Sequence, residues 1–390
     1  MQAFLLSPRF LMAWFVSLAG GLAFFLLVHF PRFIEDLGAS EVEIGLIVGS
    51  TALAAIVVRP QIGREMDRRG RRPVILLGGL SNIAVLLLYL TISSLGPWIY
   101  VVRILHGFAE AMLFASIFTY AADILPARNR TQGLALFGIS GMLPIALGGL
   151  IGDFVLDRWD FDALFATSVT LAVVAFLLSL LLTETVEPAG KHGGTSFLTP
   201  LGQRDLLPLW WITVVFSVAL AAYFTFLRTF VDETGIGTVG GFFAAYSATA
   251  ILLRLATGWL PDRVGPKRIL YPALVVFAAG FAVLAGADSN TAVLVAGALC
   301  GAGHGYVFPI LYALAFGRAD SKNRGSASAI FTGLFDVGVL VGGPTFGALI
   351  ALFSYKTMFF TAAGWILVGG IVFAVWEGDI RRRTTRVSLR

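Results

Sequence analysis

The chain contains 390 residues, of which 57% are apolar and only 13% are charged, and its formal net charge is +5. A soluble domain carries about 25% charged residues, so this composition excludes an ordinary soluble protein and indicates a membrane protein. The basic residues occur in short clusters between apolar runs, a distribution typical of membrane-protein loops and not of a nucleic-acid-binding groove.

Twelve apolar runs follow one another along the chain, six in each half, and each approaches or exceeds the roughly 20 residues that cross a bilayer. Backbone groups in lipid must be hydrogen-bonded within their own segment, so the runs are predicted to be helices and the fold an all-α membrane protein. The predicted spans are 9–31, 43–62, 74–94, 98–122, 131–155, 161–182, 207–230, 239–260, 269–287, 291–316, 326–353 and 358–376.

The distribution of lysine and arginine predicts the orientation. If both termini are cytoplasmic, 22 of the 28 basic residues lie in inside loops and tails and 4 lie in outside loops, as the positive-inside rule requires. We therefore expect an inner or plasma membrane protein. Its predicted parts are an N-terminal six-helix bundle (1–182), a cytoplasmic linker (183–206), a C-terminal six-helix bundle (207–376) and a basic cytoplasmic tail (377–390) that lies on anionic lipid headgroups.

A short charged segment occurs twice, about 195 residues apart: GREMDRRGRRP at 63–73 and GWLPDRVGPKR at 258–268. The positions that agree are Gly63, Asp67, Arg68 and Gly70 in the first copy and Gly258, Asp262, Arg263 and Gly265 in the second. A repeat at the midpoint indicates two similar halves. Two halves of the same topology are a known plan for secondary transporters.

The first copy resembles the loop signature between spans two and three of the major facilitator superfamily, and the resemblance extends over the whole chain. The segment Arg103-Ile-Leu-His-Gly107 resembles the superfamily's fourth-span signature, with His106 in place of glutamine. Spans five and eleven are similar to its glycine–proline exporter signature, through the helix-packing candidates Pro144, Gly148, Gly149, Gly342, Gly343 and Pro344. The resemblance implies two six-helix bundles related by a pseudo-two-fold axis.

Ionisable side chains within the spans are the candidate functional residues, since a charge in mid-membrane costs at least about 2.5–3.5 kcal/mol. Arg103, His106 and Glu110 share one face of the fourth span. The half-repeat places His304 opposite Glu110, and Asp336 lies at similar depth in span eleven. We hypothesise that Glu110 couples protons to transport, with the other four as partners in a substrate cavity.

Structural roles for these residues stay open as alternatives. Arg103 and Glu110 could form a self-neutralising pair, His304 could bond a neighbouring carbonyl, and Asp336 could pair with an adjacent helix.

The repeated loop is the candidate gate. Asp67 can face a helix N-terminus, where negative charge is favoured, and the resemblance implies a charge network with Arg71 and Asp123. The second copy has Pro266 and Gly317 at the corresponding positions, so we expect a weaker network there. Arg32 and Arg228, which close the first span of each half, are possible contacts for a substrate anion.

These observations predict a secondary active transporter that moves a small organic solute by alternating access, with proton-coupled export favoured. Two alternatives remain: a proton symporter that imports a carboxylate, sugar or other metabolite, and a non-transporting membrane sensor or scaffold. No nucleotide-binding motif, metal-ligand cluster or nucleophile–base pair is present, so we expect no cofactor, no metal site and no enzyme activity. The expected partners are the substrate, protons and membrane lipids, without nucleic acid, and the chain is expected to be a monomer.

Overall fold

The computed structural model describes residues 7–39, 41–185 and 197–388, which fold into helices joined by short turns and contain no strand. Twelve of these helical segments are long and apolar enough to cross a membrane. The predicted all-α membrane fold is therefore confirmed. The central residues 186–196 of the predicted linker lie outside the described part of the chain.

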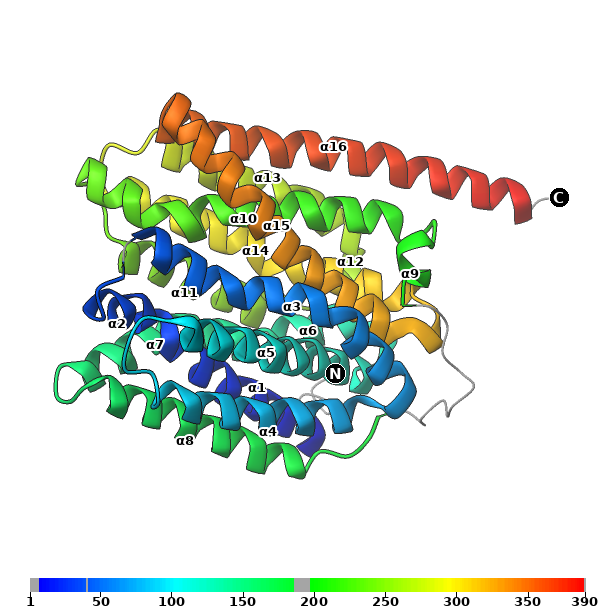
Figure 1. Cartoon of the computed structure of the whole chain (residues 1–390). Coiled ribbons are helices and arrows are strands. Elements are labelled where there is room, and N and C mark those ends of the chain that lie inside the picture. Colours follow the sequence, from blue (N-terminus) through cyan, green and yellow to red (C-terminus); the bar gives the residue numbers. More distant parts are fainter. Residues whose placement is uncertain (1–6, 40, 186–196, 389–390) are drawn as a thin grey trace. The chain divides into compact units, whose positions relative to one another are not determined.

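The helices of the first half begin and end close to the predicted spans (Figure 1). They are α1 (Pro8–Phe25), η1 (Leu26–His29), α2 (Phe30–Asp36), α3 (Glu41–Arg69), α4 (Arg71–Tyr89), α5 (Pro97–Ile124), η2 (Ala127–Asn129), α6 (Arg130–Phe137), α7 (Ile139–Leu156) and α8 (Phe161–Leu180). The largest departure is α3, which continues seven residues past the predicted end at 62 and takes most of the charged loop into the helix.

The second half repeats this order. Its helices are α9 (Thr199–Gly202), α10 (Leu207–Thr234), α11 (Val239–Thr257), α12 (Leu260–Val264), α13 (Pro266–Ala285), α14 (Asn290–Arg318), η3 (Ser321–Asn323), α15 (Arg324–Leu352) and α16 (Tyr355–Ser388). The last helix continues to Ser388, beyond the predicted end at 376, so much of the predicted tail is a helical extension of α16.

Two compact units make up the chain, and each contains a short segment from the other half of the sequence. Unit 1 comprises Met1–Pro126, Phe137–Phe197 and Ser321–Gly333, and unit 2 comprises Ala127–Leu136, Leu198–Asp320 and Leu334–Arg390. The beginning of α15 thus belongs to unit 1, and most of α6 belongs to unit 2. The sequence did not predict this exchange.

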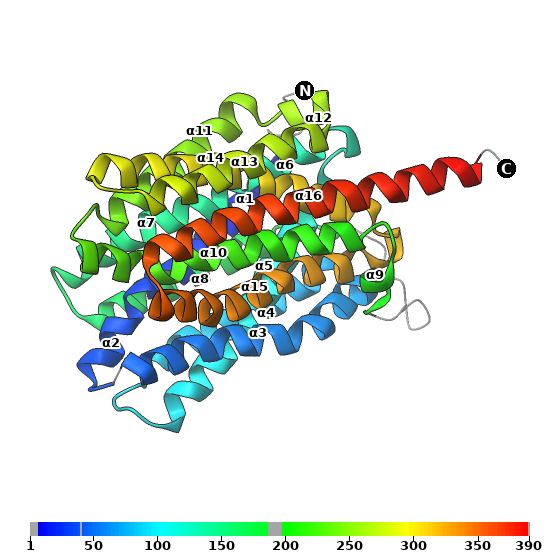
Figure 2. The ribbon, with the colours of Figure 1, turned by 90° about the horizontal axis from the view of Figure 1, so that it is seen from above.

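Within each unit one central helix packs against two neighbours in the same way. In unit 1, α5 packs against α3 and α4, and in unit 2, α14 packs against α11 and α13. In unit 2, α10 also lies beside α16, as both ribbon views show (Figures 1 and 2).

Two glycines allow neighbouring helix backbones to approach closely. A Cβ on Gly107 would collide with the Thr51 carbonyl oxygen, and one on Gly301 would collide with that of Tyr246. These are equivalent positions of the two halves, so the repeat extends to the helix interfaces.

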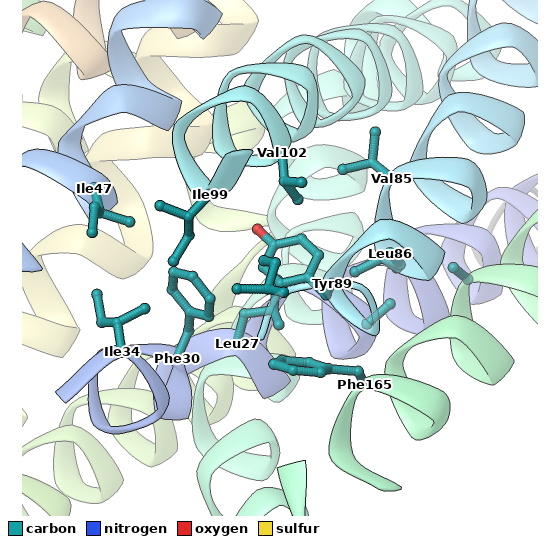
Figure 3. Close-up of a cluster of buried hydrophobic side chains, with 13 residues drawn as sticks. Leu27, Phe30, Ile34, Ile47, Val85, Leu86, Tyr89, Ile99, Val102 and Phe165 are labelled. Carbon is teal, nitrogen blue, oxygen red and sulfur yellow. The ribbon is translucent and has the colours of Figure 1, made fainter. Parts of the chain in front are cut away.

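The core of unit 1 is an aromatic and aliphatic cluster where α2, α3, α4, α5 and α8 meet (Figure 3). Tyr89 occupies its centre, with its ring edge-on to Phe30 at 5.3 Å between centroids and tilted against Phe165 at 5.4 Å. The only polar atom of the Tyr89 side chain, its hydroxyl oxygen, points toward α5 in the close-up. A tyrosine buried in this way needs a hydrogen-bond partner, which α5 supplies.

Candidate functional site

The first copy of the repeated loop forms a buried charge network around Arg71. The chain turns at Gly70, whose φ of 96° lies in the region that favours glycine, and α4 then begins with Arg71. The Arg71 side chain is buried, and its Nε donates to Asp123 Oδ2 at 2.8 Å while an Nη1–H donates to the Met66 carbonyl at 2.7 Å. Asp67 Oδ1 lies 3.6 Å from the same guanidinium. One arginine therefore pairs with two carboxylates.

Asp67 caps the N-terminus of α15. Its Oδ1 accepts the backbone N–H of Gly325 at 2.7 Å, and its Oδ2 accepts the N–H and the hydroxyl of Ser326 at 2.8 and 2.6 Å. The first N–H groups of a helix have no partner within the helix and carry partial positive charge, so a carboxylate is the preferred cap. Asp67 comes from the first half of the sequence and holds a helix of the second.

Glu184, which follows α8, closes the other side of this network. Its carboxylate accepts the backbone N–H groups of Arg71 and Arg72, each at 3.0 Å, and so caps α4. The next residue, Thr185, donates its hydroxyl to Asp123 at 3.2 Å. Sequence reasoning missed both residues because they lie in the segment assigned to the linker.

The second copy makes the equivalent cap with Asp262. Its two carboxylate oxygens accept the N–H groups of Thr131 at 3.2 Å and Gln132 at 2.7 Å, the second and third residues of α6. Burial raises the pKa of Asp262 above the ordinary aspartate value, and the hydrogen bonds from Gln132 and Thr131 act in the opposite direction. Gly265 turns the chain here with a φ of 113°, as Gly70 does in the first copy.

An ion cluster that the sequence did not predict lies next to this second copy. Glu377, near the end of the apolar part of α16, accepts two hydrogen bonds from the guanidinium of Arg318 at 2.8 and 3.1 Å and pairs with Lys267. Arg71 and Asp123 have no counterparts here. In the first copy one cation lies between two carboxylates, whereas here one carboxylate, on α16, lies between two cations, which come from α13 and α14. Glu377 was missed because it lies just past the predicted end of the last span.

Arg103 is buried among neutral partners. Its guanidinium donates to the carbonyls of Ile47 at 3.4 Å and Val48 at 3.2 Å and to the hydroxyl of Tyr89 at 3.0 Å, and it lies 5.0 Å from the ring centre of Phe30. Among the described residues Arg103 forms no ion pair. Its contacts therefore differ from the Arg103–Glu110 pair that the sequence left open as an alternative.

The titratable candidates occupy corresponding positions along their own helices. Glu110 lies midway along α5 and His304 midway along α14, and both are half-buried. His106 is buried, with its Nδ1 at 2.8 Å from the hydroxyl of Tyr89. Asp336 is half-buried in α15, one turn beyond Thr332 on the same helix face. The Tyr89 hydroxyl therefore links Arg103 and His106 by hydrogen bonds within unit 1.

Comparison with known proteins decides the family. A sequence model described as Major Facilitator Superfamily matches residues 9–271 and 231–389, which together cover almost the whole chain. The chain belongs to the Major Facilitator Superfamily. It is therefore a multi-pass membrane protein that transports small molecules, and it is not an enzyme.

Several superfamily members resemble this chain from end to end. The multidrug resistance protein MdtG of Citrobacter koseri is 26% identical over 391 residues, covering 96% of this chain and 95% of its own. MdtG of Serratia proteamaculans is 26% identical over 403 residues, covering 96% and 94%. Among solved structures, the human organic anion transporter MFSD10 superposes with a TM-score of 0.83 at 18% identity, covering 94% of this chain and all of its own.

A second solved structure, the fucose:proton symporter FucP of E. coli, superposes with a TM-score of 0.76 at 15% identity, covering 94% and 98%. At these identities the two structures support the superfamily fold alone.

The remaining candidate arginines of this superfamily member lie at separate positions on different helices. Arg32 is exposed on α2, and the side chain of Arg228 on α10 lies outside the described part of the structure. Arg68 pairs with Glu65 at 3.9 Å on the exposed face of α3, and Arg263 lies over the ring of Trp259 at 5.5 Å.

The helix-packing candidates divide into two kinds. A Cβ on Gly148 would lie 2.7 Å from Phe25, and one on Gly342 would lie 2.8 Å from Ala221. Pro144 packs against Gly21, and Pro344 lies inside α15. A Cβ on Gly149 or Gly343 would meet open space, so close packing requires a glycine at only two of these four glycine positions. Of the loop glycines, Gly63 approaches Ser326, while Gly258 packs against the Arg254 carbonyl of its own helix.

Proposed function

We propose that this transporter exports a small organic compound across the inner membrane in exchange for protons. The observation that carries the proposal is Glu110, a carboxyl group midway along an apolar membrane helix of a chain that aligns end to end with multidrug resistance proteins. The names of these relatives favour export over the import of a metabolite. A compound of the type that such proteins expel is small, organic and amphipathic.

Glu110 has the chemistry that proton coupling needs. A carboxyl group is neutral when it binds a proton and anionic when it releases one, and an anion in the membrane interior is costly. The nearest cation on the same helix face, Arg103, is seven residues away, or about 10 Å along the axis. Because the groups that hold Arg103 are neutral, no carboxylate among its described partners offsets its charge, which would favour the ionised form of Glu110.

The two aspartate caps fit the role of latches in alternating access. The distribution of lysine and arginine favours a cytoplasmic position for both termini and both repeated loops. Asp67 there holds α15 of the second half, and Asp262 holds α6 of the first half. Opening toward the cytoplasm would separate the halves and break both caps. We propose a monomer, with the basic end of α16 resting on anionic lipid headgroups.

The test uses purified protein in liposomes with an imposed pH gradient, and a substrate identified by a thermal-shift screen of metabolites and drugs. We expect the wild type to drive the substrate uphill as protons move in the opposite direction. Glu110→Gln should abolish pH-driven uphill flux and retain downhill exchange, because the amide cannot bind the proton. Glu110→Asp, which keeps the carboxyl group, is the matched control. Undiminished uphill flux in Glu110→Gln would refute the proposal, and protons moving with the substrate would indicate symport.

A further inference from the structure

His304 lies within an aromatic surround in unit 2. Its ring stands edge-on to Phe216, with centroids 5.2 Å apart, and lies 5.9 Å from Phe308. Phe335 packs against both of these rings, at 5.9 Å from Phe216 and 5.3 Å from Phe308. Three phenylalanines from α10, α14 and α15 thus gather around one half-buried imidazole.

A directional hydrogen-bond chain determines which nitrogen of His304 carries the proton. The hydroxyl of Tyr223 donates to that of Tyr246 at 3.2 Å, and the hydroxyl of Tyr246 is bonded to His304 Nδ1. The Tyr246 oxygen accepts from Tyr223, and among the described residues Nδ1 is the one acceptor for the proton of Tyr246 itself, so Tyr246 donates to Nδ1. The neutral imidazole then carries its proton on Nε2.

The same arrangement occurs in unit 1, where an arginine takes the place of Tyr223. Arg103 can only donate, and it donates to the Tyr89 hydroxyl at 3.0 Å. Tyr89 then donates to His106 Nδ1 at 2.8 Å, so His106 also carries its proton on Nε2. The two histidines differ in access, because His106 is 1% exposed whereas His304 is half-buried.

Resting on the proposed export function, the structure assigns to His304 the recognition of substrate: its Nε2–H donates a hydrogen bond to an acceptor oxygen on a flat aromatic compound. Among the described residues Tyr246 is the hydrogen-bond partner of His304, and it occupies Nδ1, which leaves Nε2–H for a ligand. The rings of Phe216, Phe308 and Phe335 make the surroundings of the imidazole aromatic, which favours an aromatic substrate over an aliphatic one. The preferred ligands are neutral or anionic aromatic compounds that carry a carbonyl group.

This assignment separates two roles that one histidine could have. A proton carrier would have to exchange its proton during the cycle, whereas a fixed donor keeps it. Two tyrosine hydroxyls hold the ring in one tautomer and orientation before the ligand arrives, which is how supporting hydrogen bonds prepare a binding group. Tyr246 is therefore a positioning residue for His304.

The first experiment determines the tautomer by NMR of protein labelled with ¹⁵N-histidine. The chain has four histidines, so His304→Gln identifies the resonances of His304. We expect a neutral ring protonated on Nε2 at pH 7, and a mixture of tautomers after Tyr246→Phe. Tyr306→Phe is the matched control, since the Tyr306 hydroxyl bonds Thr257 and not a histidine. A ring protonated on Nδ1, or doubly protonated, would overturn the assignment.

The second experiment measures binding of 9-fluorenone and fluorene by equilibrium dialysis. These compounds share their rings, but only fluorenone has a carbonyl. We expect wild-type protein to bind fluorenone about two- to tenfold more tightly, the range that one net hydrogen bond supplies.

His304→Gln should keep this preference through its side-chain N–H, and His304→Phe should abolish it while changing fluorene affinity less than about twofold. Equal affinities in the wild type, or an unchanged preference in His304→Phe, would overturn the proposal. Glu110→Gln should leave the preference intact, so failure of proton coupling and failure of this assignment are distinguishable.

Discussion

Replacing Asp67 by asparagine tests whether the cap on α15 holds the cytoplasmic end closed. The carboxylate accepts three hydrogen bonds from Gly325 and Ser326 and lies 3.6 Å from Arg71. An asparagine must turn its NH₂ toward one of the two backbone N–H groups, and an unsatisfied buried donor costs roughly 1–3 kcal/mol. The remaining bonds lose the assistance of charge, which about halves their strength.

Together these losses amount to roughly 2–4 kcal/mol, or a roughly 30- to 700-fold shift in the equilibrium between capped and released α15. The readout is the rate at which a membrane-impermeant maleimide labels Ser328→Cys in inside-out vesicles. Ser328 is buried on α15 against Thr119, and the native Cys300 is also buried, so background labelling should be slow. We expect Asp67→Asn to raise the rate at least about tenfold, because labelling follows the released population until it saturates.

The control is Asp157→Asn, which makes the same chemical change at an exposed position between α7 and α8. Thermal unfolding of each variant distinguishes release of the cap from loss of the fold. A labelling rate within twofold of the parent, with the variant folded, would show that the cap does not hold the cytoplasmic end closed. An equal rise in Asp157→Asn would show that the assay does not report on this site.

Two further variants test the second loop and the helix interfaces. Because the pKa of Asp262 is raised in the folded protein, its contribution to stability is greatest below its unfolded pKa of about 3.8 and is lost as pH rises through the folded value. The Tm of the wild type minus that of Asp262→Asn should therefore be larger at pH 4 than at pH 7, and the reverse trend would contradict the assignment. Gly107→Ala should lower stability by about 1–3 kcal/mol through overpacking against the Thr51 carbonyl, whereas Gly343→Ala should be nearly neutral; equal Tm values would exclude the close contact.

The sequence predicted the helices well because a membrane span needs a long apolar run, and these runs are separated by charged turns. It predicted their ends poorly where polar residues continue a helix, as at Arg69 in α3 and Glu377 in α16. Hydrophobicity marks what lies in lipid, whereas the end of a helix depends on capping partners. In α3 the continuation carries Arg69, which pairs with Glu65 one turn earlier on the same helix. In α16 it carries Glu377, which pairs with Lys267 of α13 and Arg318 of α14.

The candidate site was predicted by residue type but not by partner. Asp67 was expected to meet a helix N-terminus, and it does, but its partner Ser326 is 259 residues away and no local pattern identifies it. Arg103 was expected near a carboxylate, and the structure instead gives it the Tyr89 hydroxyl and two backbone carbonyls. Tyr89 itself had no sequence signal, because a tyrosine in an apolar run is usually a membrane-interface residue.

The two halves share their scaffold but differ in the chemistry at matching positions. The half-repeat that pairs Gly107 with Gly301 also pairs Arg103 with Gly297 and Glu110 with His304. At these two positions the first half therefore has an arginine and a glutamate. The second half has a glycine, which has no side chain, and a neutral histidine surrounded by phenylalanines. This difference fits the two proposals, which put proton exchange at the carboxyl group on α5 and substrate recognition at the neutral ring on α14. If both hold, Glu110→Gln and His304→Phe should impair separate steps of one cycle.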